Sequence, residues 1–271
     1  MKYRLLVLDI DGTVTNSRKE VTEKTRKAII RLQEKGVRVA IASGRHPRGV
    51  IPVAQLLDFQ RFENFILAFN GAKIMDVRHK RCIYERTLPA HIPARLWKDA
   101  TQKGLGILTY TDNALIAGTK PDAYTELEAR ISHIPIEYHE DFCQAVKFPV
   151  NGCLITGSPE DIEAMEPVFA HRYFHETQIF RSEPCFLEVV PKNVDKAYSL
   201  KHLLSILGIA REEMVCCGDS FNDISMLRYA GLGVAMANGQ KEVKDAANYI
   251  TENDNDHDGI AEVIERFFPD G

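Results

Sequence analysis

The apolar run Leu5-Leu6-Val7-Leu8, followed at once by Asp9-Ile10-Asp11-Gly12-Thr13, constrains the fold more than any other stretch of the chain. Four apolar residues without a polar break predict a strand that is buried on both faces, as in a parallel sheet. Two carboxylates at the end of such a strand are costly to bury unless they share a cation or a chemical task. A plain Asp-Gly turn stays open as the alternative. An EF-hand calcium loop is excluded, because no acidic ligand follows at the required spacing.

Composition narrows the class of protein and of partner. The 271 residues are 45% hydrophobic and 27% charged, which is typical of a globular protein with room for one core and an insertion. A formal charge of −4 argues against a nucleic-acid or anionic-membrane partner. No apolar stretch has the length of a signal peptide or a membrane span. The six scattered cysteines and nine histidines form no C-x-x-C or H-E-x-x-H pattern, so we expect reduced thiols, no zinc site and a cytoplasmic protein.

The first part of the chain has the pattern of a parallel α/β sheet. A helix predicted over 22–35 ends at Gly36, and a buried strand follows over 37–42, which makes a right-handed βαβ unit with the first strand. A helix over 47–57 and a strand over 65–69 come next, and Asn70-Gly71 then predicts a hairpin.

Beyond residue 83 the expected strands are shorter and alternate with helices, which indicates an inserted α+β domain over 83–186. Its predicted strands cover 107–110, 115–117 and 150–156, and its helices cover 94–103, 123–131 and 159–169. The pattern of a parallel sheet returns with an apolar strand near 186–190, so we expect a discontinuous Rossmann-like core over 1–82 and 187–271. The remaining core elements are expected at 195–207, 214–217, 224–230, 231–235, 241–246, 248–251 and 259–268. The polar run 253–258 is interpreted as a solvated loop that leads into the last helix.

Three predicted core strands end in polar groups: Asp9 with Asp11, Ser43-Gly44, and Gly218-Asp219. Parallel strands share a carboxyl edge, so we expect these groups to converge there. Asp9, Asp11 and Asp219 would supply the hard oxygen ligands that Mg²⁺ prefers. Ser43, with the amides that follow it, suits phosphate oxygens. Lys196, which follows a strand and opens a helix, can reach the same edge as a point charge.

Taken together, Asp9-Ile10-Asp11-Gly12-Thr13, Ser43, Lys196 and Gly218-Asp219-Ser220-Phe221-Asn222-Asp223 resemble the four ordered motifs of the haloacid-dehalogenase-like phosphatases. The Ala42-Ser43-Gly44-Arg45 segment, Asn70-Gly71 and the position of the insertion are similar to the Cof-like sugar-phosphate phosphatase branch, whose cap is of type IIB. Many relatives have glycine where this chain has Asn193 and Ala197. Asparagine tolerates a left-handed turn, so this departure leaves the assignment of Lys196 in place.

The resemblance implies a role for each motif. Asp9 would be the nucleophile that forms an aspartyl-phosphate, and Asp11 would protonate the leaving alkoxide and then activate water. Lys196 would neutralise phosphate charge and orient Asp9. The candidate substrate- and phosphate-binding residues are Gly12, Thr13, Ser43, Gly44, Arg45, Asn70, Gly71, Lys196 and Asn222. The candidate metal ligands are Asp9, Asp11, Asp219, Asn222 and Asp223, with Asn222 and Asp223 supporting either the metal or Lys196. Arg45 could equally pair with an acidic side chain.

These expectations combine into a Mg²⁺-dependent phosphatase that acts on small phosphomonoesters, with sugar phosphates as the expected class. Its partner would be a small phosphorylated metabolite, and the chain would be a monomer or a small homo-oligomer. A hexose phosphomutase and a non-catalytic sugar-phosphate-binding module are the alternatives. Specificity would come from the insertion, which carries no motif. Its candidate residues are Asp112, Asn113, Lys147, Arg181 and Ser182.

Overall fold

The computed structural model describes residues 2–269 and divides the chain into two compact units. The core unit comprises Met1–Ser43, Val50–Tyr84 and Asp195–Gly271, and the inserted unit comprises Gly44–Gly49 and Glu85–Val194. The sequence prediction had the insertion at 83–186. The inserted unit therefore extends further toward the C-terminus and also contains six residues that follow Ser43. Among residues 2–269, no helix combines the length and apolar character needed to cross a membrane.

The core unit is built on an eight-stranded sheet in the order β14-β13-β12-β1-β2-β3-β4-β5. The strands and helices that lie wholly or mostly in this unit are β1 (Leu5–Leu8), α1 (Glu23–Glu34), β2 (Arg38–Ala42), α2 (Pro47–Leu56), β3 (Phe65–Ala68), β4 (Lys73–Asp76), β5 (Arg81–Glu85), α7 (Lys196–Leu207), β12 (Met214–Gly218), α8 (Ile224–Tyr229), β13 (Leu232–Ala235), α9 (Lys241–Ala246), β14 (Tyr249–Ile250) and α10 (Gly259–Phe267). The strands from β14 to β3 pair in parallel, and β4 returns antiparallel to β3 as the expected hairpin. The prediction of a mostly parallel α/β core is confirmed.

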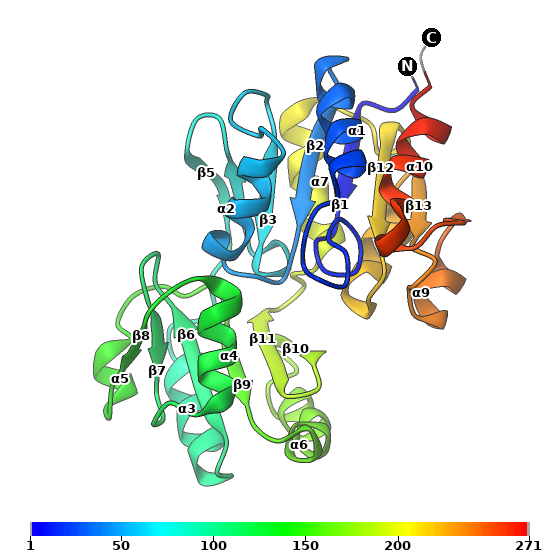
Figure 1. Ribbon diagram of the computed structural model, residues 1–271. Coiled ribbons are helices and arrows are strands. Elements are labelled where there is room, and N and C mark those ends of the chain that lie inside the picture. Colours follow the sequence, from blue (N-terminus) through cyan, green and yellow to red (C-terminus); the bar gives the residue numbers. More distant parts are fainter. Residues whose placement is uncertain (1, 270–271) are drawn as a thin grey trace. The chain divides into compact units, whose positions relative to one another are not determined.

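Strand β1 lies in the middle of this sheet, and all four of its residues are fully buried. Helices α1 and α10 pack against each other on one face, while α7 lies on the other (Figure 1). Leu5 and Val7 belong to the hydrophobic cluster that the leucines of α7 complete. An apolar run with helices on both faces explains why β1 shows no alternation of polar and apolar residues. The register places the end of β1 beside the ends of β2 and β12.

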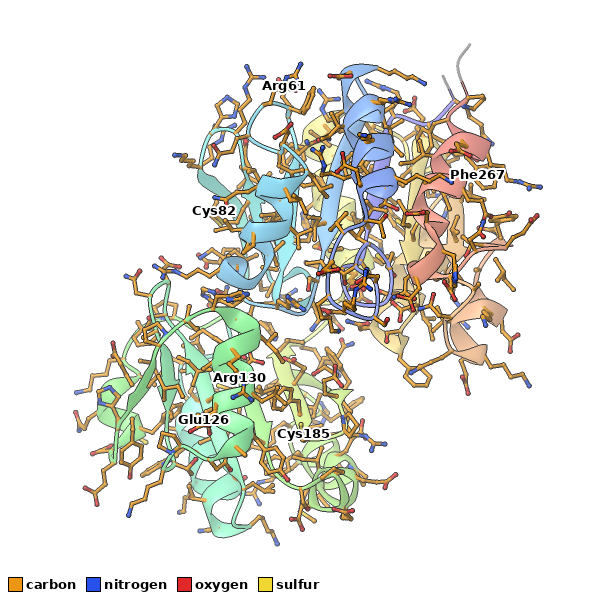
Figure 2. All side chains as sticks on the ribbon, viewed as in Figure 1. Arg61, Cys82, Glu126, Arg130, Cys185 and Phe267 are labelled. Carbon is orange, nitrogen blue, oxygen red and sulfur yellow. The ribbon has the colours of Figure 1, made fainter. Side chains whose placement is uncertain are left out.

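The inserted unit contains a six-stranded sheet in the order β10-β11-β9-β6-β7-β8. Its elements are α3 (Ile92–Gln102), β6 (Gly106–Tyr110), β7 (Leu115–Ala117), α4 (Ala123–Ser132), β8 (Ile136–Tyr138), α5 (Phe142–Ala145), β9 (Cys153–Thr156), α6 (Pro159–Arg172), β10 (Thr177–Glu183) and β11 (Phe186–Pro191). Most neighbouring strands pair antiparallel, and only β7 and β8 are parallel. Helix α4 exposes Glu126 and Arg130 (Figure 2) and buries Thr125 and Glu128. The alternation is that of an amphipathic helix.

The prediction that the strand near 186–190 rejoins the parallel sheet is wrong. Strand β11 pairs antiparallel with β9 and β10 in the sheet of the inserted unit. Five of its six residues are buried, so it reads as an apolar run without alternation. Such a run shows that a strand is covered, but it does not indicate which sheet the strand joins. The chain re-enters the core unit only at Asp195, directly before α7.

Candidate active site

Lys196 lies at the centre of the polar groups at the carboxyl edge of the core sheet. It is the first residue of α7, and the preceding Asp195 caps the helix by accepting a hydrogen bond from the Tyr198 amide at 2.7 Å. The lysine is fully buried, and its Nζ lies 2.6 Å from Asp9 Oδ1 and 2.6 Å from Asp223 Oδ1. Burial alone would lower the pKa of Lys196, but the two carboxylates outweigh it and raise that pKa above its usual value. Lys196 therefore stays charged.

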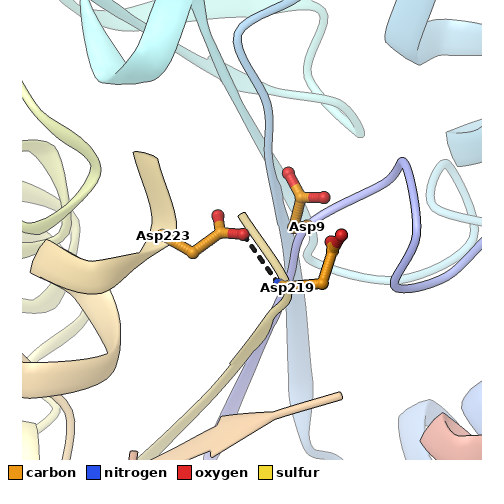
Figure 3. A group of neighbouring side chains, drawn as sticks. All are labelled: Asp9, Asp219 and Asp223. Atoms are coloured by element: carbon orange, nitrogen blue, oxygen red, sulfur yellow. Dashed lines mark hydrogen bonds between the residues drawn. The ribbon is translucent and has the colours of Figure 1, made fainter. Parts of the chain in front are cut away.

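Three carboxylates gather around this one cation. Oxygen atoms of Asp9, Asp219 and Asp223 all lie within 4.8 Å of one another (Figure 3). Burial, reinforced by the charges of Asp223 and Asp219, raises the pKa of Asp9 well above its usual value, although Lys196 opposes the shift. Burial and Asp223 raise the pKa of Asp219 to about 6. Three acids against one lysine leave an excess of negative charge in a buried site, and a hard divalent cation matches this all-oxygen donor set.

Asp223 uses both of its carboxylate oxygens within the protein. Oδ1 accepts from Lys196, and Oδ2 accepts from the backbone amides of Asp219 at 2.9 Å and Ser220 at 3.0 Å, the first of which is the dashed line in Figure 3. A Cβ on Gly218 would come within 2.5 Å of the Asp223 side chain, so only glycine fits there. Asp223 thus ties the end of β12 to the buried lysine.

The residues after Asp9 approach Asp219 from the other side. Thr13 Oγ1 donates to Asp219 Oδ1 at 2.9 Å. Gly12 has a φ of +77°, and a Cβ there would lie 2.4 Å from Asp219 Oδ2, which explains the glycine twice over. The Asp11 carboxylate pairs with Lys19 Nζ at 2.8 Å. Sequence reasoning missed Lys19, because an exposed lysine in a loop carries no signal of its own.

A left-handed turn after β3 joins three of the predicted site residues. Phe69, Asn70 and Gly71 have φ values of 51°, 53° and 98° in succession, a backbone conformation that is costly for the phenylalanine. The Asn70 amide donates to Ser43 O at 3.0 Å, and Asn70 Oδ1 accepts from Asn222 Nδ2 at 3.0 Å. Asn70 Nδ2 is buried without a hydrogen-bond partner among the described residues. An oxygen of a bound ligand would satisfy this donor.

Gly44 and Arg45 belong to the inserted unit. Arg45 Nη1 donates to Gly49 O at 3.3 Å, and its charge acts on Glu128, whose pKa burial nevertheless raises. Three of the candidate specificity residues also have partners in this unit: Asn113 with Arg48, Arg181 with Glu166, and Ser182 with Glu188.

Comparison with known proteins agrees with this geometry. Residues 6–264 match the model of the haloacid dehalogenase-like (HAD) hydrolase family. A 5-amino-6-(5-phospho-D-ribitylamino)uracil phosphatase from Bacillus subtilis is 30% identical over 265 residues, which cover 96% of this chain and 94% of the relative. A HAD-like hydrolase from Bacteroides thetaiotaomicron is 43% identical, with a TM-score of 0.92 over 98% of this chain and 100% of its own. A HAD subclass IIB sugar phosphatase is 26% identical, with a TM-score of 0.82 over 98% of this chain and 99% of its own.

The family match spans nearly the whole chain, both units included. It thereby agrees with the resemblance that the four motifs predict. The solved structures share the mixed α/β architecture at TM-scores of 0.92 and 0.82. The chain belongs to the haloacid dehalogenase-like hydrolases and is an enzyme of the phosphatase class of that family.

Proposed function

We propose that this enzyme hydrolyses small phosphomonoesters, with sugar phosphates as the substrate class, through an aspartyl-phosphate formed on Asp9. The observation that carries the proposal is the fully buried Lys196, held at 2.6 Å by both Asp9 and Asp223 beside Asp219. Burying a charge of this kind costs desolvation free energy. Stabilising the negative charge of a phosphoryl group is a function that would explain why the lysine is buried there.

In the first step, a carboxylate oxygen of Asp9 attacks phosphorus and the bond to the leaving oxygen breaks. Lys196 holds Oδ1 of Asp9 and thereby orients the carboxylate for attack. Asp11 gives its proton to the departing alkoxide, so the alcohol leaves neutral. In the second step, water attacks phosphorus and passes a proton to Asp11, the bond between the Asp9 oxygen and phosphorus breaks, and inorganic phosphate leaves with the Asp9 carboxylate regenerated. Ser43 and the unpartnered Nδ2 of Asn70 are the proposed donors to the phosphoryl oxygens, and Thr13 joins them by turning its hydroxyl away from Asp219 Oδ1.

We assign the metal site to Asp9, Asp219, the Asp11 backbone carbonyl and Asn222, with Mg²⁺ as the cation. Asn222 donates its Nδ2 to Asn70, so its Oδ1 remains as the ligand atom. Asp223 is assigned to Lys196, because both of its oxygens already accept hydrogen bonds. A bound Mg²⁺ would neutralise part of the negative charge shared by the carboxylates and the phosphate. The chain's own residues must hold the nucleophile and the proton donor in place.

We propose that the inserted unit acts as the cap that selects the leaving group. The subclass IIB sugar phosphatase and the phosphatase of a phosphoribityl compound support a polyol chain as the phosphate carrier. The six cysteines are free thiols, four of them buried, which fits the reducing cytoplasm that we propose as the compartment.

A phosphate-release screen tests the proposal. The purified chain with Mg²⁺ is offered hexose, pentose, polyol, nucleotide and cofactor monophosphates, and the products are separated to detect isomers. We expect free phosphate, with the highest kcat/KM on a sugar or polyol phosphate. An isomeric sugar phosphate without net phosphate release would establish the mutase instead. Binding of sugar phosphates without turnover of any substrate would establish the binding module.

A further inference from the structure

The loop that carries the proposed proton donor has little regular structure of its own. Between β1 and α1, the residues 11–22 contain no helix or strand of a sheet. The amides of Thr13, Val14 and Thr15 all donate to Ile10 O, at 3.3, 3.1 and 2.9 Å, which winds the first turn. From Ser17 to Glu20 the side chains are exposed. A loop of this kind needs outside contacts to hold one conformation.

Those contacts come from the other end of the chain. Asn255 Nδ2 donates to Thr15 O at 2.9 Å, more than 200 positions away in sequence. Asp256 Oδ1 accepts from both the amide of Ser17 at 2.7 Å and its hydroxyl at 2.9 Å. These two bonds hold the pKa of the Asp256 carboxyl below its usual value.

Two further residues, Asn238 and Asp258, bond the two ends of this loop, residues 11–22, which we call the catalytic loop. Asn238 Nδ2 donates to Gly12 O at 2.8 Å, and Asn238 Oδ1 accepts from the Asn255 amide at 3.1 Å. Asp258 Oδ1 accepts from the hydroxyl of Thr25 at 3.1 Å and also from that of Thr22. The segment from Gly12 to the first turn of α1 is therefore bonded at four places. Asn238, Asn255, Asp256 and Asp258 are named the clamp residues.

The clamp is itself fixed to the core unit. Asp254 accepts from the amides of Asp256 and His257 at 3.0 Å each, which closes the turn. Glu262 on α10 accepts from the Glu252 amide and from the amide and side chain of Asn253. The polar run that sequence analysis interpreted as a solvated loop is thus hydrogen-bonded both to α10 and to the loop that carries Asp11.

We infer that the clamp residues are positioning residues for Asp11. They fix the backbone on both sides of the Asn16–Glu20 turn, from which Lys19 reaches Asp11 Oδ1 at 2.8 Å. That turn is closed by Asn16, whose Oδ1 accepts from the amides of Arg18 and Glu20. The inference rests on the proposed role of Asp11 as proton donor. Loosening the clamp misplaces the donor, while Asp9, which directly follows β1, and Lys196, which opens α7, keep their positions.

A leaving-group comparison tests this inference. The double variant Asn255→Ala/Asp256→Ala is assayed with Mg²⁺ on a hexose 6-phosphate, whose alkoxide needs a proton, and on p-nitrophenyl phosphate, whose phenolate does not. We expect kcat/KM, which reports on formation of the aspartyl-phosphate and not on its hydrolysis, to fall at least about tenfold on the sugar phosphate and less than about threefold on the aryl ester, since proton donation contributes roughly 10²–10⁴-fold. Asp245→Ala, which removes an exposed carboxylate from α9, is the matched control and should change neither rate.

Hydrogen exchange provides a readout that does not depend on turnover. Peptides covering residues 12–22 should exchange faster in the double variant, with no change in peptides from β1. Equal losses on both substrates, no loss on either, or unchanged exchange in 12–22 would overturn the inference. Wild-type protein that releases phosphate from no ester would refute the proposed function instead, and the exchange experiment would still decide whether the clamp orders the loop.

Discussion

The two units of this chain bury ionisable side chains in different ways. In the core unit, Asp9 and Asp223 share one fully buried lysine, so each charge has an opposite charge within 2.6 Å. In the inserted unit, the buried acid Glu128 accepts hydrogen bonds from the hydroxyls of Tyr110 and Ser132. Burial raises the pKa of Glu128 there, which favours its neutral form. The core unit pairs its buried carboxylates with a buried lysine, whereas the inserted unit surrounds Glu128 with hydroxyl groups and favours its protonated form. Only the first arrangement suits phosphoryl chemistry.

Replacing the proposed nucleophile should have the largest effect on phosphate release. A small effect would contradict the view that the paired charges of the core unit carry out the chemistry. Asp9→Asn keeps the shape of the side chain and removes the attacking oxygen's charge. We expect phosphate release to fall by on the order of 10⁴-fold or more, as for loss of a nucleophile in other enzymes. Circular dichroism should report an unchanged fold. A variant that retains full activity would refute catalysis through an aspartyl-phosphate.

Removing the shared cation tests whether the core depends on its countercharge. Lys196→Met leaves two buried carboxylates without their shared countercharge, so the free energy of unfolding should fall by about 3–5 kcal/mol. Urea denaturation in the absence of metal measures the loss. Lys241→Met, at the exposed start of α9, is the matched control and should stay near wild type. A Lys196→Met protein as stable as wild type would show that the carboxylates do not need the lysine.

A divalent cation should stabilise the wild-type protein. Mg²⁺ at a hundredfold excess over its dissociation constant would add about 2.7 kcal/mol of stability by mass action. The gain should vanish in Asp219→Asn, which removes one carboxylate of the cluster but leaves Lys196 paired. Thermal denaturation with Mg²⁺ and with a chelator provides the measurement. An equal gain in the variant would place the metal elsewhere.

The core unit could be predicted from the sequence more completely than the inserted unit. Asp9, Ser43, Lys196 and Asp219 could be predicted as candidate site residues, because acids, a serine and a lysine at strand and helix ends are unusual and the order of the motifs is specific. In the inserted unit, the short strands β8 and β10 and the four-residue helix α5 were missed. Strand β10 reads Thr-Gln-Ile-Phe-Arg-Ser-Glu and lies at the edge of its sheet, where exposed polar side chains weaken the alternation that identifies a strand.

The clamp was missed for a different physical reason. Its bonds join residues more than 200 positions apart, and they use ordinary asparagine and aspartate side chains. The run 253–258 precedes the last helix as predicted, although Asn255–His257 form a short 3-10 helix within it. Its contacts could not be predicted, since a capped polar turn looks the same in sequence whether water or another loop faces it. Lys19 was hidden in the same way, because its pairing with Asp11 depends on how the catalytic loop folds back.

The smallest expected effect lies in the inserted unit and sharpens the comparison. Burial, followed by the charge of Glu128, raises the pKa of Glu188 from 4.5 to about 8, so the folded protein holds a proton that the unfolded chain releases above pH 4.5. Stability of this unit should therefore fall as the pH rises from about 4.5 to about 8, and level off above that range.

Glu188→Gln should flatten this dependence of stability on pH. Glu126→Gln, which replaces an exposed acid on α4, is the control and should leave it unchanged. Trp97, the one tryptophan of the chain, lies on α3 and reports unfolding of this unit by fluorescence during urea titration. If Glu188→Gln leaves the pH slope unchanged, the inserted unit does not keep this acid protonated, and the contrast with the core fails there.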